Sequence, residues 1–567
     1  MPRHLVLFSI LFTLRAAAAL PLGQVPPGKT FLVILPHHDD HTWEYTFGGL
    51  IAKFADAGYT GYYVRVTNDE KDGALGWAGN NMINLKETVE AVRYLGMKDV
   101  ISLNWRNDHT DSVPLNEMRA QLILLIRKYR PEAVMAYDPW GHYDRNPDHR
   151  KSAKAVAEAT WAAGNPNFLP EHLTLGLRPW RVPYRYFAQR SDYGRGYRPN
   201  IAFELNESQM ERKSKAYWMN RNIRLHPSMA RSIRAQLDRQ GLTIPELEGL
   251  SDEDAAKRLQ EWRMYWISAV RGKENGVKYA EVFDFMDEFD DLPALKGPLT
   301  GTKVSFPEYP KAALPSPKTV LVVTAHGGDY VLSAGGTVAR LAGSGSDVYV
   351  IRVANDEKES RDLLPEEAAA RSRVENEEAA RILGAKAIIS LGYRSGELGA
   401  VSPTELRDRL LFYFLRYRPD AMFLPNPYTE HDDQLDHLYT GSAAEEASLA
   451  AGLANFQPPF ALVGLSRHSA PDLYYYSLPL DSGMAEPEST AAFVPQPIGF
   501  DITQTFAVKL KAAEALRTAN NAFSAELSER LARTGRRLPP KLIELRLRNL
   551  GMTELFLHAR MNYGYLY

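Results

Sequence analysis

The sequence contains a long internal repeat. The stretch RKYRPEAVMAYDP, which includes Arg130–Pro131, returns as LRYRPDAMFLPNP with Arg418–Pro419, and Asp148–His149 returns as Asp436–His437. Both pairs lie 288 residues apart, and offsets that differ by one residue elsewhere are explained by loop insertions. A period of this length is that of a whole domain rather than of a solenoid unit. The sequence therefore predicts two domains of one fold in tandem.

Each copy predicts an α/β domain. Short apolar runs alternate with segments whose apolar residues recur at helical spacing, which indicates a mainly parallel sheet with helices on both faces. We expect strands over 31–35, 61–66, 100–103, 133–137, 184–187 and 201–205. We expect helices over 48–57, 84–94, 115–129, 208–224 and 242–274, the fourth starting at a Ser208–Glu211 cap. The expected boundaries are 25–295 for the first domain, 296–317 for a linker rich in Pro and Gly, and 318–567 for the second domain.

Composition excludes several kinds of partner and chemistry. The 567 residues carry a net charge of −2, which gives no general attraction to nucleic acid or to an anionic membrane surface. The chain has no cysteine, so disulfides, thiolate metal sites and a cysteine nucleophile are excluded. Any bound metal ion must therefore be held by His, Asp or Glu.

The first twenty residues resemble a secretory signal peptide. Arg3 precedes the apolar run Leu5–Leu14, and Ala17 and Ala19 fit the rule for small residues at the cleavage site. The run is too short to span a bilayer comfortably, and no later segment is apolar enough to do so. We therefore expect removal of residues 1–20, a secreted or periplasmic protein, and no transmembrane segment in the mature chain.

Two polar clusters follow predicted strands of the first copy. They are His37-His38-Asp39-Asp40-His41, after the first strand, and Asp138–Arg150, after the fourth. Because the carboxyl ends of parallel strands meet at one edge of a sheet, His37, Asp40 and His149 could bind one cation. Two imidazoles and a carboxylate with an open fourth position form a catalytic zinc site, although iron, cobalt and manganese also suit it. Asp39 would remain free to act as general base toward water.

These motifs resemble those of the LmbE-like (PIG-L) N-acetylglucosaminyl deacetylase family. That family carries A-H-P-D-D-E after its first strand and H-x-D-H further along the chain. The resemblance implies Rossmann-like domains and a zinc-dependent hydrolase that removes acetyl groups from amino sugars. It also implies that His37, Asp40 and His149 bind the metal and that Asp39 is the catalytic base. Both copies share the pattern, so the resemblance extends over nearly the whole mature chain.

This sequence departs from the family pattern at several positions. His38 and His41 replace the family's Pro and Glu, and Asn146 replaces the first His of H-x-D-H. Asn146 can donate a hydrogen bond to an oxyanion, so we expect it to bind substrate, but it cannot act as a general acid. His142 is our candidate for that acid and Tyr143 is a second one. The alternative is that His142 is a loop residue without a role.

The second copy retains the metal-ligand pattern and lacks the base. His326, Asp329 and His437 take the three ligand positions and form a possible second metal site. Gly328 stands at the position of Asp39, and Gln434 at that of Asn146. The residues of the same loop that could compensate are Glu430, His431, Asp432 and Asp433. We expect a catalytically degenerate domain rather than a second active centre.

Asp69 lies in an Asn-Asp-Glu turn after the second strand, and the second copy repeats this turn at Asp356. The corresponding loop of the family reaches the substrate pocket, so Asp69 is a candidate substrate-binding residue, with a surface turn as the alternative. Aromatic residues in or near the predicted loops suit the apolar faces of sugar rings, or equally a domain interface. They are Trp43, Tyr45, Trp77, Trp105 and Trp140.

The predicted function is that of a metal-dependent hydrolase that removes an N-acetyl group from an amino sugar or its glycoside, with a small-molecule or glycan substrate. Two alternatives stay open. One is a non-catalytic carbohydrate-binding or scaffold protein with vestigial sites, and the other is a hydrolase of a different amide or ester. Asp39 favours catalysis, because a binding module has no need of a carboxylate beside the metal ligands.

Overall fold

The structure is a computed structural model that describes most of the chain. The described residues are 19–25, 28–141, 144–189, 199–224, 227–241, 245–304, 306, 308–429, 432, 434–453, 456–477 and 496–560. Residues 1–18 of the expected signal peptide lie outside this set, as do His142, Tyr143, Glu430, His431 and Asp433. The chain divides into two compact units. Unit 1 comprises Met1–Val113, Lys128–Thr160 and Val182–Asp287, and unit 2 comprises Pro114–Arg127, Trp161–Arg181 and Glu288–Tyr567.

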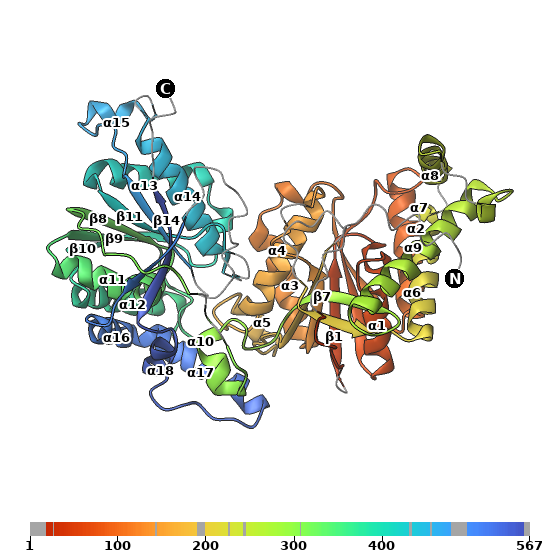
Figure 1. Cartoon of the computed structure of the whole chain (residues 1–567), viewed down its shortest axis with the longest axis horizontal. Helices are drawn as coiled ribbons and strands as arrows, with labels where there is room; N and C mark the ends of the chain where they lie inside the picture. The colour runs from red at the N-terminus through yellow and green to blue at the C-terminus, as the bar shows by residue number, and fades with distance from the viewer. Residues whose placement is uncertain are drawn as a thin grey trace. The chain divides into compact units, whose positions relative to one another are not determined.

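Unit 1 is built around a seven-stranded sheet (Figure 1). Its strands are β1 (Thr30–Leu35), β2 (Thr60–Thr67), β3 (Asp99–Trp105), β4 (Ala133–Tyr137), β5 (Tyr184–Ala188), β6 (Ile201–Glu204) and β7 (Ala280–Met286). They lie in the order β3-β2-β1-β4-β5-β7-β6, parallel from β3 to β5, with β7 antiparallel to both neighbours. The strand order reverses between β1 and β4, which is where open α/β sheets bind ligands at their carboxyl edge.

The helices in the first half of the chain connect these strands. They are α1 (Gly48–Asp56), α2 (Trp77–Tyr94), α3 (Leu115–Tyr129), α4 (Pro147–Ala162), α5 (Glu171–Thr174), α6 (Glu207–Met219), α7 (Arg221–Arg224), α8 (Pro227–Arg239) and α9 (Asp252–Glu274). Three short 3-10 helices are η3 (Asp40–Thr42), η4 (Thr110–Ser112) and η5 (Pro245–Leu247). Of these helices, α1 and α2 both pack against α6, so a helical layer covers one face of the first sheet.

Unit 2 repeats the same sheet. Its strands are β8 (Thr319–Thr324), β9 (Asp347–Ala354), β10 (Ala387–Tyr393), β11 (Ala421–Pro425), β12 (Asp472–Tyr476), β13 (Gln496–Asp501) and β14 (Thr553–Arg560), in the order β10-β9-β8-β11-β12-β14-β13. Its helices are α10 (Pro293–Thr300), α11 (Gly327–Gly343), α12 (Pro365–Ile382), α13 (Pro403–Tyr417), α14 (Leu435–Ala451), α15 (Pro459–Leu462), α16 (Phe506–Ala515), α17 (Arg517–Arg533) and α18 (Leu542–Asn549), with η6 at Leu398–Ala400. The matching strand order confirms two tandem domains of one α/β fold.

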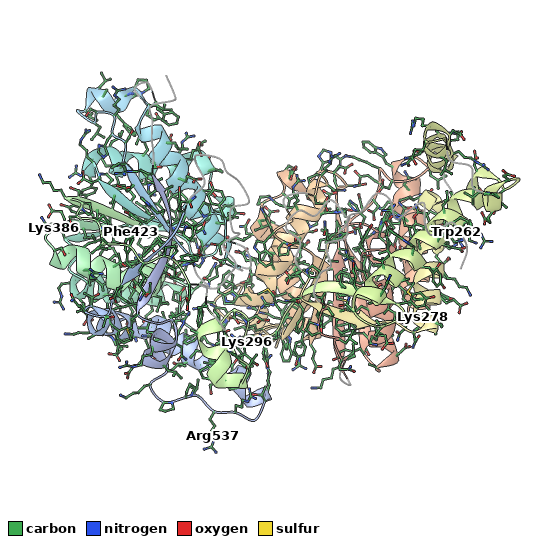
Figure 2. All side chains as sticks on the ribbon, viewed as in Figure 1. Trp262, Lys278, Lys296, Lys386, Phe423 and Arg537 are labelled. Atoms are coloured by element: carbon green, nitrogen blue, oxygen red, sulfur yellow. The ribbon has the colours of Figure 1, made fainter. Side chains whose placement is uncertain are left out.

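The central strands of unit 2 bury both of their faces. Val320 and Val322 of β8 belong to one hydrophobic core, and the alternate residues Leu321 and Val323 belong to another. Phe423 of β11 joins the first core and lies among the packed side chains of unit 2 (Figure 2). Strands buried on both faces have few positions for polar residues, which is why they are visible in the sequence as continuous apolar runs.

The structure differs from the sequence predictions at several element ends. Helix α2 begins at Trp77 rather than at 84, and the helix expected over 242–274 begins only at Asp252. The cap expected at Ser208–Glu211 is wrong, because Asn206 and Gln209 form the reciprocal capping box of α6 instead. The antiparallel strands β7 and β14 were not predicted, and α10 lies across the start of the expected linker. In these segments charged or polar residues interrupt the apolar runs, so the sequence gave no clear periodicity.

A helix that crosses a bilayer must be both long and apolar. Within the described residues, no helix combines these two properties to the extent that a membrane span requires.

Candidate metal centre

Three side chains of unit 1 converge at the carboxyl edge between β1 and β4. His37 follows β1, Asp40 opens η3, and His149 lies in the first turn of α4. The His37 Nδ1 atom lies 3.1 Å from Asp40 Oδ2 and 3.1 Å from His149 Nε2, and His149 Nε2 lies 3.5 Å from Asp40 Oδ1. Ligand atoms about 2.0–2.2 Å from one tetrahedral cation would be roughly 3.3 Å apart, so the three fit a shared zinc-sized ion.

Asp40 is held from two sides. The backbone N–H of His37 donates to its Oδ2 at 2.8 Å, and the hydroxyl of Tyr137 donates to its Oδ1 at 2.9 Å. Tyr137 is the last residue of β4, and its ring stacks on His149 with 4.3 Å between ring centroids. The two strands that flank the site therefore fix both the carboxylate and one imidazole.

Each histidine also has a carboxylate at its other ring nitrogen. His149 Nδ1 lies 2.7 Å from Asp144 Oδ2, and His37 Nε2 lies 3.3 Å from Asp148 Oδ2. Metal-binding histidines commonly pair their second nitrogen with a carboxylate, which sets the tautomer and the ring orientation. The rings are thus oriented with the opposite nitrogens toward the centre of the triad.

The carboxylate of Asp148 is hydrogen-bonded both to the loop after β3 and to His37 of the site. Its Oδ2 accepts the backbone N–H of Asp108 at 2.7 Å, and its Oδ1 accepts the hydroxyl of Thr110 at 2.6 Å. The amide of Asn107 lies 3.3 Å from the same carboxylate and 3.4 Å from His37 Nε2. Asp148 therefore orients His37 rather than capping α4, where the side-chain oxygen of Asn146 accepts the Asp148 backbone N–H.

The charges of the cluster favour a bound cation. Burial would lower the pKa of His37, but the carboxylates of Asp40 and Asp148 raise it well above its ordinary value. Burial would raise the pKa of Asp40, but the positive charges of His149 and His37 lower it below its ordinary range. The site therefore attracts positive charge strongly, and a divalent cation can take the place of the imidazole protons.

Asp39 lies directly before the ligand Asp40 and is only 5% exposed. Its Oδ2 accepts a hydrogen bond from the indole N–H of Trp43 at 3.2 Å. A buried carboxylate next to the triad has the chemistry that a general base needs, and this role of Asp39 stays a prediction.

The two expected substrate-binding residues occupy structural positions. Asn146 caps α4 through its side-chain oxygen. Asp69 is fully buried, and its carboxylate accepts hydrogen bonds from the guanidinium of Arg65, the hydroxyl of Thr67 and the backbone N–H of His38. These contacts bind the loop after β1 to strand β2, so a direct role of Asp69 or Asn146 in substrate binding stays a prediction.

Unit 2 contains a second triad of the same design. Asp329 Oδ2 lies 3.6 Å from His326 Nδ1 and 3.3 Å from His437 Nε2. The outer nitrogens again face carboxylates, with His437 Nδ1 2.7 Å from Asp432 and His326 Nε2 3.2 Å from Asp436. The expected second set of ligands is therefore brought together, although nothing in this arrangement identifies a particular metal.

Asp432 does not take the position that Asp39 has in unit 1. It contacts His437 as Asp144 contacts His149, and in both units the carboxylate also accepts a backbone N–H, from Gln434 or Asn146. Asp432 thus holds the position of Asp144 rather than that of Asp39.

Sequence reasoning missed four groups that shape the first site: Asn107, Tyr137, Asp144 and Trp43 in its role toward Asp39. Asp144 could have been found, because the spacing Asp-x4-His occurs in both copies as Asp144–His149 and Asp432–His437. Tyr137 left no such signal, since the second copy has Pro425 at that position. Asn107 reaches the site only through the folding of a distant loop.

Comparisons with known proteins find relatives among deacetylases. The PIG-L model, described as GlcNAc-PI de-N-acetylase, matches residues 32–160 and 321–448. A diacetylchitobiose deacetylase of Thermococcus kodakarensis is 30% identical over 203 residues, covering 35% of this chain and 70% of that protein. A 1D-myo-inositol 2-acetamido-2-deoxy-alpha-D-glucopyranoside deacetylase of Catenulispora acidiphila is 26% identical over 185 residues, covering 27% and 56%. The solved N,N'-diacetylchitobiose deacetylase from Pyrococcus horikoshii is 26% identical, with a TM-score of 0.36 over 51% of this chain and 94% of its own.

Proposed function

Because the chain belongs to the PIG-L (GlcNAc-PI de-N-acetylase) family, we propose that unit 1 is a metal-dependent hydrolase that removes the N-acetyl group of an amino sugar or its glycoside. The observation that carries this proposal is the buried triad of His37, Asp40 and His149 with the carboxylate of Asp39 beside it. The substrate class is supported by relatives named as deacetylases of diacetylchitobiose and of a 2-acetamido-2-deoxyglucoside.

The residues of unit 1 supply the proton transfers that amide hydrolysis needs. A zinc ion held by the triad would supply Lewis-acid polarisation of the acetyl carbonyl. Asp39 takes a proton from the attacking water, whose oxygen bonds to the acetyl carbon. The C–N bond then breaks, and the departing nitrogen receives a proton from Asp39 or from His142. The products are acetate and a free amine.

Export of the protein is part of the proposal. Residues 1–20 have the basic start, short apolar run and small-residue cleavage site of a signal peptide. We expect the mature chain to begin near residue 21 in the periplasm or the medium. N-terminal sequencing of protein recovered from those fractions, compared with the cytoplasmic fraction, tests this; an uncleaved chain confined to the cytoplasm would contradict it.

The test of the catalytic proposal measures metal content and acetate release on the same samples. The mature protein, Asp39→Asn and His149→Ala are assayed for zinc, iron, cobalt and manganese and for acetate released from N,N'-diacetylchitobiose. Asp39→Asn should keep its metal and lose about 10²- to 10⁴-fold in kcat, the range for removal of a general base. His149→Ala should lose both the metal of unit 1 and activity. Asp238→Asn, an exposed carboxylate of α8, is the matched control.

Each failure has a distinct meaning. Absence of metal in the wild-type protein would refute the metal centre itself. Metal without cleavage of any N-acetylated sugar would refute the substrate class. An Asp39→Asn variant with full activity would remove Asp39 from the role of base and leave the metal assignment in place.

A further inference from the structure

We propose that copies of this chain associate head to tail, with a face of unit 2 on one chain covering two loops of unit 1 on the next. A contact of this kind already exists once inside unit 2. There, segments 114–127 and 161–181, which the repeat assigns to the first copy, pack on loops of the second copy. Both sides of that contact recur elsewhere in the chain, where they are exposed. The inference is independent of the reaction proposed for unit 1.

The contact inside unit 2 is centred on a buried aromatic ring. Phe168 is 2% exposed, and its ring lies so close to Gly396 that a Cβ atom there would come within 2.7 Å of it. The ring centroid lies 4.2 Å from Lys358 Nζ and 5.1 Å from the guanidinium of Arg119, which donates to the carbonyl of Gly396. The side chain of Asn165 donates to the carbonyl of Lys358 at 2.8 Å. A buried aromatic anchor with hydrogen bonds around it is typical of a specific interface.

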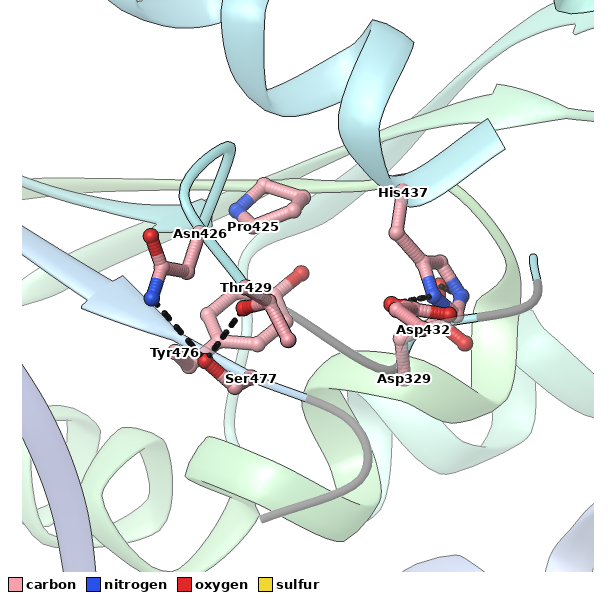
Figure 3. A pocket seen from close by; sticks show the side chains of 8 residues that line it. All are labelled: Asp329, Pro425, Asn426, Thr429, Asp432, His437, Tyr476 and Ser477. Atoms are coloured by element: carbon pink, nitrogen blue, oxygen red, sulfur yellow. Dashed lines mark hydrogen bonds and ion pairs between the residues drawn. The ribbon is translucent and has the colours of Figure 1, made fainter. Parts of the chain in front are cut away.

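The loop that Phe168 covers borders the site of unit 2. The backbone N–H of Gly396 donates to Asp436 at 2.6 Å, and Asp436 lies 3.2 Å from His326 Nε2. Asp436 directly precedes His437, which lines the pocket of unit 2 (Figure 3). The segment from the first copy therefore supports a loop that contacts the site.

The repeat places a second version of this covering face on unit 2. Asn116, Arg119, Asn165 and Phe168 correspond, 288 residues on, to Thr404, Arg407, Leu453 and Phe456, which we call the docking face. The stack of a guanidinium on a ring is retained, because Arg407 lies 4.8 Å from the ring centroid of Phe456. The docking face is more accessible than its counterpart, since Leu453 is 40% exposed and Phe456 is only half-buried.

The counterparts of the covered loops are exposed in unit 1. Loops 355–364 and 394–397 of unit 2 correspond to loops 68–76 and 106–109 of unit 1, which we call the loop pair. Residues 73–76 and 108–109 of the loop pair are exposed, whereas Lys358 and Ser360 of unit 2 are buried. The backbone N–H of Asp108 donates to Asp148, so the loop pair borders the site of unit 1 in the same way.

Leucine side chains on both surfaces favour their association. Leu75 lies two residues before α2, as Leu363 lies two residues before α12. Leu363 is half-buried where Asn167 donates to its carbonyl at 3.2 Å, but Leu75 is 48% exposed. On the docking face, Leu453 replaces the polar Asn165. Removal of these exposed apolar groups from water would stabilise the contact between two chains.

The docking face and the loop pair are different surfaces, so each chain offers one of each. Contacts between unlike surfaces are heterologous, and they generate a closed ring or an open filament rather than a dimer with one self-complementary patch. In such an assembly, the docking face of each chain covers the loops beside the site of unit 1 on its neighbour.

The experiment changes one surface at a time in the mature protein and follows assembly by sedimentation velocity at micromolar concentration. Leu453→Asp alters the docking face, and Leu75→Asp alters the loop pair; both residues are exposed, so a charge is compatible with the fold. We expect the wild-type protein to sediment as two or more chains and each variant as a single chain. An equimolar mixture of the two variants should form dimers and nothing larger, because one intact surface of each kind remains, on different chains.

Leu462→Asp is the matched control. Leu462 is 87% exposed, but its counterpart Thr174 stays exposed in the segment that packs inside unit 2, so this position lies outside the contact and assembly should be unchanged. The proposal is overturned if the wild-type protein is a single chain, if Leu453→Asp or Leu75→Asp leaves the assembly intact, or if the mixture of natively melting variants forms no dimer. None of these measurements depends on bound metal or on acetate release.

Discussion

His37 in unit 1 and His326 in unit 2 are followed by two different local structures. In unit 2, α11 starts directly after the histidine, so Asp329 lies in the first turn of a long helix. In unit 1, the chain forms η3 and a loop before α1 begins at Gly48. The segment from the histidine to the Gly-Gly pair is two residues longer in unit 1 than in unit 2. The longer loop contains Trp43, whose indole donates to Asp39. The carboxylate that we propose as the base and its hydrogen-bond donor thus occur together in unit 1.

In both units a buried pair of glutamate and lysine holds the helix that follows the histidine. Glu281 accepts the backbone N–H groups of Gly49 and Leu50 at 2.9 and 2.7 Å and pairs with Lys213 at 2.8 Å. In unit 2 the equivalent residue, Glu554, accepts those of Gly336 and Thr337 at 2.9 and 2.7 Å and pairs with Lys509 at 2.7 Å. The buried glutamate and lysine that hold the helix are therefore the same in both units, whereas the residue at the position of Asp39 is Gly328 in unit 2.

The largest expected effect tests whether the buried glutamate-lysine pairs stabilise the two units equally. Glu281→Gln and Glu554→Gln each leave a buried lysine without its counter-charge, which we expect to cost about 3–5 kcal/mol of stability in the unit concerned. Differential scanning calorimetry of the two variants should show similar losses. Glu211→Gln, which breaks an exposed pair with Lys215, is the control and should leave the melting curve unchanged. A large loss of stability in only one unit would show that the two buried pairs are not equivalent.

The second prediction concerns the carboxylates behind the histidines. Asp144→Asn should weaken metal binding in unit 1, and Asp432→Asn in unit 2, each by about 10- to 100-fold, because each removes the group that orients a ligand histidine. Titration against a chromophoric chelator measures the two affinities. If Asp432→Asn left metal binding unaltered while Asp144→Asn weakened it, the second triad would not be a metal centre.

The third prediction concerns Trp43, which lies in the loop that only unit 1 has after its first histidine. Trp43→Phe removes the indole donor to Asp39 and should lower kcat by roughly 10-fold or more, the size of one hydrogen bond to a charged group, with metal content unchanged. Trp262→Phe, on α9, provides a tryptophan control at a partly exposed position. Loss of metal in Trp43→Phe would show that the loop supports the triad rather than the base.

The smallest expected effect concerns the rim of unit 1. Trp77, at the start of α2, is 59% exposed and lies 5.5 Å from the guanidinium of Arg106, the neighbour of Asn107 at the site. The second copy has Pro365 at this position. If the indole supports a sugar ring, Trp77→Ala should raise KM for a disaccharide about 2- to 10-fold and leave kcat unchanged. Leu364→Ala, at an exposed position of unit 2, should alter neither constant.

Local sequence patterns account for several features of the molecule. The repeat predicts two similar domains, and apolar runs such as 31–35 and 133–137 locate the strands that border the site. Polar clusters directly after those strands predict that His37, Asp40 and His149 meet at one sheet edge, and the repeat predicts the second triad. Antiparallel β7 and β14 escaped prediction because charged and polar residues interrupt their apolar runs.

The fold class, the duplication and the residues that converge on each triad follow from the amino-acid sequence, because strand periodicity and the internal repeat are properties of the chain itself. The way in which those residues are held depends on the folded chain. Tyr137, Asn107 and the pairing of His37 with Asp148 depend on contacts between segments far apart in the chain. Hydrogen bonds of this kind depend on distances of a few tenths of an ångström, which no local pattern of residue types encodes.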